Sequence, residues 1–114
     1  MKAEAPVRPV DAAGVILLRG RREAPEILLG RRYAKATFLP DIYVVPGGRV
    51  DPEDRLPSGF PEQLHPAVAK GLQAGNARRP PLAFLRAALR ELHEETGLIV
   101  GRRGSGTPRA GALW

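Results

Sequence analysis

The chain contains no cysteine, which excludes disulfide bonds and thiolate metal sites and suits a reducing compartment. Its two histidines, His65 and His93, have no partner at ligand spacing, so a histidine-based metal site is not expected. No apolar run approaches the roughly 20 residues that cross a bilayer. The segment after Met1 also lacks the hydrophobic stretch of a secretory signal. We therefore expect a cytoplasmic protein that does not bind membranes.

The remaining composition is that of one small globular domain. A chain of 114 residues can bury one core, and 43% apolar with 26% charged residues is ordinary for a folded protein. The net charge of +6 comes largely from arginine, whose guanidinium suits bidentate contacts with phosphate. A codon bias toward arginine explains the same charge equally well. The charge alone therefore does not identify a ligand.

Short apolar segments in the first half of the chain predict strands. Residues 12–19 (AAGVILLR) predict a buried strand, and residues 26–32 (EILLGRR) predict a second strand that pairs with it as a hairpin. Residues 33–42 are expected to form a loop, followed by a short strand at residues 43–45. Pro46 ends that strand, and Gly47-Gly48 then permits a tight bend or a close backbone approach.

The second half of the chain contains the clearest element. Residues 82–96 predict a helix that follows Pro80-Pro81 and stops at Gly97. Its apolar side chains form one stripe about 80° wide that is expected to face a core: Leu82, Leu85, Leu89, Leu92 and Thr96. A shorter helix is expected within residues 62–73, and a strand at residues 98–100.

Three acidic side chains share another face of the long helix. Glu91, Glu94 and Glu95 stand at i, i+3 and i+4, where like charges repel each other, and close to the C-terminal end, where the helix dipole disfavours them. A divalent cation would offset both effects, and hard cations such as Mg²⁺ prefer oxygen ligands. Arg90 lies at i−4 from Glu94 and can orient a carboxylate. The alternative is a solvated charged face, as on most such helices.

The string that carries these acids, RELHEETGL from Arg90 to Leu98, resembles the second half of the Nudix box, R-E-U-x-E-E-x-G-U with U aliphatic. Pro46-Gly47-Gly48 after a short strand is similar to the family's entry into that box. The resemblance implies an α/β fold, a Nudix-type α/β/α sandwich around a mixed sheet. It also implies hydrolysis of a diphosphate linkage in a nucleoside diphosphate derivative, with Mg²⁺ or Mn²⁺ as cofactor.

The resemblance also implies roles for single residues. Glu94 and Glu95 would be the principal metal ligands, with Glu91 a further ligand or the group that activates water. Arg90 would orient the glutamates. The carbonyl of Gly47 would complete the metal site, and Gly48 would lie against the substrate.

The Nudix box of this chain departs from the family pattern by an insertion at about residues 55–81. The pattern expects a glutamate where Asp54 stands, which leaves open whether Asp54 or Glu53 joins the site. The insertion and the stretch around PGG resemble the acyl-CoA diphosphatase branch, so CoA or acyl-CoA is one candidate substrate beside ADP-ribose and NADH. Arg32 would contact substrate phosphate in that branch, although a solubilising charge on an edge strand explains it too.

The resemblance covers about residues 10–100, whereas a Nudix domain normally continues with further strands and a helix. We therefore expect residues 1–114 to form a single, partial domain, incomplete at its C-terminal end and with uncertain activity by itself. The alternatives are a non-catalytic module that binds nucleotides or RNA, and an inactive truncated product. The expected partner is a small molecule and not nucleic acid, and a homodimer is consistent with the family.

Overall fold

The strands lie in the first half of the chain and pair as two-stranded antiparallel ladders. The computed structural model describes residues 5–37, 39–56, 64–75 and 77–101. In it, the ladders are β1–β6, β2–β3 and β4–β5. The strand bounds are β1 Ala12–Gly14, β2 Leu18–Arg21, β3 Ala24–Ile27, β4 Gly30–Arg31, β5 Tyr43–Val44 and β6 Gly47–Arg49.

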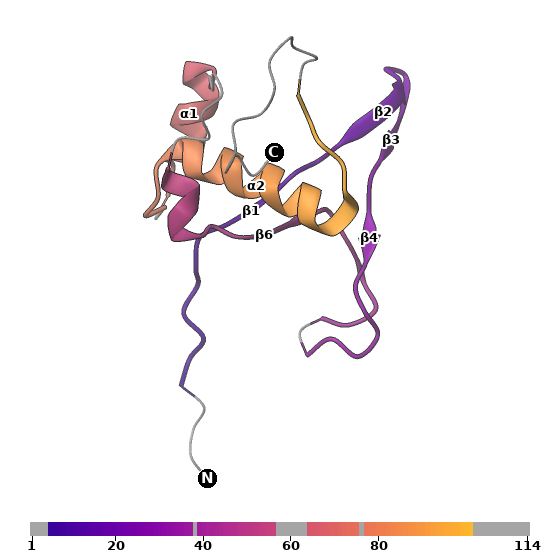
Figure 1. The fold of residues 1–114 in the computed structure, drawn as a ribbon, viewed down its shortest axis with the longest axis horizontal. Coiled ribbons are helices and arrows are strands. Elements are labelled where there is room, and N and C mark those ends of the chain that lie inside the picture. The colour runs from indigo at the N-terminus through magenta and orange to yellow at the C-terminus, as the bar shows by residue number, and fades with distance from the viewer. Residues whose placement is uncertain (1–4, 38, 57–63, 76, 102–114) are drawn as a thin grey trace.

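The predicted hairpin is confirmed, but its strands are shorter and less buried than expected. Residues 12–19 divide between β1 and β2, because the chain leaves β6 and then pairs with β3. Every residue of β2 and β3 is exposed, and the hairpin projects beyond the helices (Figure 1). Ile16 keeps 67% of its surface exposed, so the prediction of a buried strand is wrong. In the described part of the chain, no other helix or strand packs against this hairpin.

Helix α2 (Pro81–Thr96) confirms the long helix and crosses β1 and β6 (Figure 1). Pro80 is its N-cap, and Gly97 ends it with a φ of 74°, a left-handed conformation that glycine adopts readily. Two further helical segments, η1 (Pro52–Arg55) and α1 (Pro66–Leu72), pack against α2. Of the shorter helix expected within residues 62–73, residues 62 and 63 lie outside the described residues.

The core lies on a face of α2 that the leucine stripe did not predict. Val50, Ala83 and Ala87 form the buried cluster, with Ala13 and Phe84 packed against it. Small side chains on α2 let the helix approach β1 and β6 closely. Of the predicted stripe, Leu92 is fully buried and Thr96 is exposed, while the three leucines between residues 82 and 89 are half-buried.

Two other expectations about the fold differ from the structure. Residues 98–100 are exposed and form no strand, because no described strand lies beside them. All pairings among the described residues are antiparallel, so the mixed sheet of the expected sandwich is not among them. The structure is a mixed α/β arrangement of small antiparallel sheets and helices. None of the helices in the described ranges is both long and apolar enough to cross a membrane.

Candidate functional site

The outer edge of β6 faces the acidic end of α2. The amides of Val15 and Val50 pair with Pro46 and Asp11 across the β1–β6 ladder. Because an antiparallel ladder alternates between bonded and non-bonded pairs, the backbone groups of Gly47 and Arg49 point away from β1. Side chains of α2 form hydrogen bonds with these outward-pointing backbone groups. Glu95 Oε2 accepts from the Gly47 amide at 3.2 Å, and Arg90 Nη2 donates to the Arg49 carbonyl at 3.0 Å.

Arg90 is the centre of the hydrogen-bond network between these elements. Its Nε and Nη2 donate to the two oxygens of Asp54, both at 3.1 Å, which is the bidentate geometry that guanidinium favours. Its Nη1 donates to Glu91 Oε1 at 2.9 Å and to Glu94 Oε2 at 3.3 Å. The hydrogen bond to Asp54 raises the pKa of Arg90 above its usual range, although burial opposes the rise. Arg90 therefore stays cationic and donates hydrogen bonds to two of the predicted glutamates.

Asp54, and not Glu53, joins this network. Its side chain is only 3% exposed, and besides Arg90 it accepts from the Asp51 amide at 2.7 Å. Arg86, one helical turn before Arg90, donates to the Asp54 carbonyl at 3.0 Å. Sequence reasoning missed Arg86, although the spacing of Arg86 and Arg90 on the alanine-rich face of α2 is a usable signal. Asp54 is committed to holding Arg90 and so acts as a positioning residue.

The three predicted metal-binding glutamates have two different sets of partners. Glu91 and Glu94 share Arg90 Nη1, whereas Glu95 lies at the Gly47 amide. Within the described residues, no three acidic or histidine side chains form a group that could hold a metal ion. Glu94 is 55% exposed and Glu91 only 17%. Glu94 can therefore turn toward a ligand without leaving a buried charge.

Gly47 and Gly48 confirm the close backbone approach predicted for this pair. A Cβ at Gly47 would meet the Ala13 carbonyl oxygen and lie 2.7 Å from Gly14 Cα, whereas a Cβ at Gly48 would lie 2.5 Å from Glu91 Oε1. Neither position has room for a side chain. The neighbour of Gly47 is fixed backbone, and that of Gly48 is the end of a flexible side chain.

Because the two neighbours differ, alanine substitutions at Gly47 and Gly48 should have different effects. Gly47→Ala should lower the free energy of unfolding by about 2–3 kcal/mol, because the β1–β6 ladder has to shift. Gly48→Ala should cost about 1 kcal/mol or less but displace the Glu91 carboxylate from Arg90. Urea unfolding measures the first effect and side-chain NMR of Arg90 the second. Gly30→Ala is the control, since its nearest neighbour is 3.9 Å away. An equal loss of stability in both variants would contradict this reading.

A hollow of about 370 Å³ opens beside the acidic end of α2. It brings together residues far apart in the sequence, among them Arg31, Arg32, Gly47 and Glu95. Both arginines line the hollow, and Arg31 also forms an ion pair with Asp41. The structure thus places the predicted phosphate-binding arginine near Gly47 and Glu95, while Gly48 lies against Glu91.

The structure was compared with those of known proteins. The structure is similar to the crystal structure of a NUDIX hydrolase from Alicyclobacillus acidocaldarius, with a TM-score of 0.61 and 29% sequence identity. The match covers 96% of this chain and 47% of that one. No family model and no curated protein matches the chain. The chain is therefore structurally related to a Nudix hydrolase and spans about half the length of that protein.

Proposed function

We propose that the chain belongs to the Nudix hydrolases and that its site serves to hydrolyse a diphosphate linkage in a nucleoside diphosphate derivative. The observation that carries the proposal is the placement of the Nudix-box residues at one end of α2: Arg90 holds Glu91 and Glu94, and Glu95 accepts from the Gly47 amide of β6. These are the residues that match the Nudix box. The structural relationship to a Nudix hydrolase supports the same assignment.

The donor atoms of the site fit Mg²⁺ or Mn²⁺ in their chemistry. They are oxygens only, from three carboxylates and from the outward-facing backbone of Gly47, and hard cations select such ligands. Glu94 and Glu95 are exposed residues whose hydrogen bonds to Arg90 and Gly47 can be exchanged for bonds to a cation. When bound, the cation supplies charge neutralisation for the diphosphate oxygens and activation of water.

The other residues of the site position the substrate and the carboxylates. Arg90, held by Asp54, fixes Glu91 and supplies one positive charge among the acids, so the glutamates remain directed at β6. Arg32 contributes a guanidinium at the neighbouring hollow, where it can bind a substrate phosphate. The hollow of about 370 Å³ falls within the size range of small-molecule sites. Together with the resemblance around PGG, this favours CoA-type, ADP-ribose-type or NADH-type substrates.

Removal of the metal is the direct test of this function. The protein should be incubated with CoA, ADP-ribose, NADH and nucleoside triphosphates, and the release of phosphorylated products should be followed by chromatography. We expect turnover of at least one compound with Mg²⁺ or Mn²⁺ and a loss of more than about 100-fold in EDTA, restored by excess metal. Turnover that is unchanged in EDTA would contradict a metal-dependent diphosphatase.

A non-catalytic module that binds nucleotides is the second candidate function. It is favoured by the present bonding of the glutamates, which are satisfied by Arg90 and Gly47 without a cation. In this case, nucleotide binding should persist in EDTA, and no substrate in the panel should be cleaved. The same assay, combined with a binding measurement, therefore distinguishes the two functions.

A further inference from the structure

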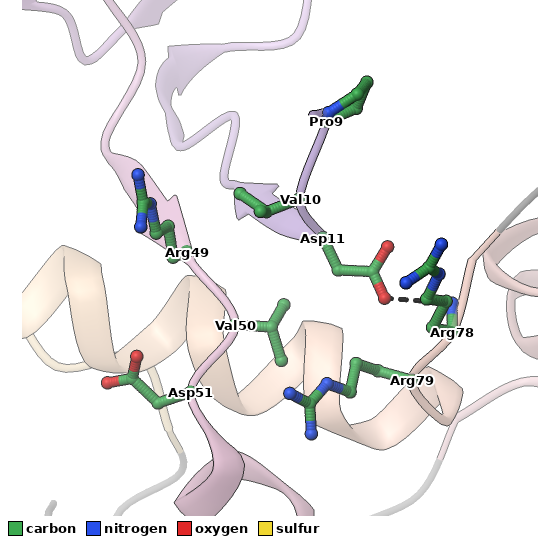
Figure 2. A pocket seen from close by; sticks show the side chains of 8 residues that line it. All are labelled: Pro9, Val10, Asp11, Arg49, Val50, Asp51, Arg78 and Arg79. Atoms are coloured by element: carbon green, nitrogen blue, oxygen red, sulfur yellow. Dashed lines mark hydrogen bonds between the residues drawn. The ribbon is translucent and has the colours of Figure 1, made fainter. Parts of the chain in front are cut away.

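A second and larger hollow, of about 650 Å³, lies around the end of β6 (Figure 2). Residues 9–11, residues 49–51 and residues 78–79 line it. The segment before α2 is attached to the N-terminal segment here, because Asp11 Oδ2 accepts from the Arg78 amide at 2.9 Å. Three segments distant in the sequence thus form one concave surface. Of its lining side chains, Asp51 also contacts Arg90 of the candidate site, whereas the three arginines belong to this hollow alone.

The charged side chains that line this hollow are mainly positive. It is lined by Arg49, Arg78 and Arg79, and in the part of the chain that the structure describes these side chains form no hydrogen bond or ion pair. Each of the two acidic residues in the lining has a partner of its own. Asp11 accepts from a backbone amide, and Asp51 Oδ2 lies 3.5 Å from Arg90 Nη2. Three guanidinium groups beside a cavity, without a partner among the described residues, indicate an anionic ligand.

The shape and the apolar part of the hollow define the ligand further. Its volume lies within the range of small-molecule sites, and Val50, only 7% exposed, lies among the arginines with Val10 nearby (Figure 2). A phosphorylated organic molecule could place its phosphate on the guanidinium groups and its apolar part on the valines. A continuous nucleic-acid backbone fits less well, because Asp11 and Asp51 also line the hollow and its arginines therefore offer no unbroken positive track.

We propose that Arg49, Arg78 and Arg79 form a binding site for the phosphate groups of a small phosphorylated ligand, separate from the glutamates of α2. The site needs no metal, because its charge is already positive. It does not depend on the proposed diphosphatase function. Arg78 and Arg79 fall within the segment that interrupts the Nudix box, so the proposal also gives that segment a role in binding.

Inorganic diphosphate is the probe that tests this site. Its binding to the whole chain should be measured by calorimetry at low salt and in EDTA, so that metal binding does not contribute. We expect binding to the unaltered protein, and a dissociation constant about tenfold higher in Arg78→Gln/Arg79→Gln. Arg21→Gln/Arg22→Gln is the matched control, because it removes the same charge from the β2–β3 hairpin and should leave binding unchanged. Glu94→Gln/Glu95→Gln should also bind normally.

Several results would overturn the proposal. One is the absence of diphosphate binding, and another is equal weakening in the two arginine variants, which would indicate a general charge effect. Because carboxylates without metal repel diphosphate, markedly stronger binding in Glu94→Gln/Glu95→Gln would place the probe at the other site. Stronger binding of an oligonucleotide of about 20 nucleotides than of diphosphate, weakened equally by both arginine pairs, would indicate a nucleic-acid surface instead. Amide NMR spectra should confirm that each variant is folded.

Discussion

Replacing Asp54 with asparagine should lower the free energy of unfolding by about 3 kcal/mol. The Asp54 side chain is 3% exposed and receives two parallel hydrogen bonds from Arg90, whose own side chain is 9% exposed. Removing one member of a buried ion pair typically costs about 3–5 kcal/mol, because the other charge stays behind without its partner. The lower end applies here, since Arg90 keeps Glu91 and Glu94 as neighbours. Urea unfolding followed by circular dichroism measures the change.

The neighbouring residue provides the control for this prediction. Glu53 is exposed and lies beside Asp54 in η1, so Glu53→Gln removes the same charge and should change stability by no more than about 0.5 kcal/mol. Arg90→Lys should resemble Asp54→Asn, because one ammonium group cannot reproduce the paired bonds to Asp54 and the bond to the Arg49 carbonyl. Equal stability of Asp54→Asn and Glu53→Gln would show that the ion pair is not a structural element.

The elements with strong local signals were predictable from the sequence. The long helix follows from two prolines before it and Gly97 after it, and the hairpin follows from two apolar segments around a polar turn. Burial was less predictable, because it depends on which face is covered by another element. The apolar residues near Ile16 read as a buried strand, yet the described structure leaves them exposed. On α2, the alanines and not the leucines form the closest contact with the strands.

Some features of the candidate site could also be predicted from the sequence, and others could not. The spacing of Glu91, Glu94 and Glu95 places them on one helix face, and PGG predicts a close backbone approach, so the contacts of Glu91 and Glu95 with the two glycines of β6 could be anticipated. The choice between Asp54 and Glu53 could not, because neighbouring residues in a short 3-10 helix point in different directions and only the packing of η1 on α2 decides which is buried. The arginine-lined hollow was also beyond sequence reasoning, since it joins three separate segments.

Substituting glutamine for Glu94 or Glu95 should lower the affinity for Mn²⁺ by about tenfold or more and the metal-dependent turnover by about 100-fold or more, with almost no effect on folding. Each substitution keeps the size and hydrogen-bonding capacity of the side chain but removes a negative charge. Titration of Mn²⁺ followed by the electron paramagnetic resonance of the free ion measures affinity. The substrate panel measures turnover. Glu26→Gln, on the exposed β2–β3 hairpin, is the matched control for both.

The stability of these variants separates a ligand-binding role from a structural one. Glu94 and Glu95 repel Glu91 and lie where the helix dipole disfavours negative charge, so neutralising either one relieves an unfavourable term of a few tenths of a kcal/mol. Glu94 loses its hydrogen bond to Arg90 in exchange, at 3.3 Å and with 55% of its side chain exposed, which is a weak contact. The free energy of unfolding without metal should therefore stay within about 0.5 kcal/mol of the unaltered protein. If the variants lose stability but bind Mn²⁺ normally, these glutamates stabilise the fold and are not ligands of the cation.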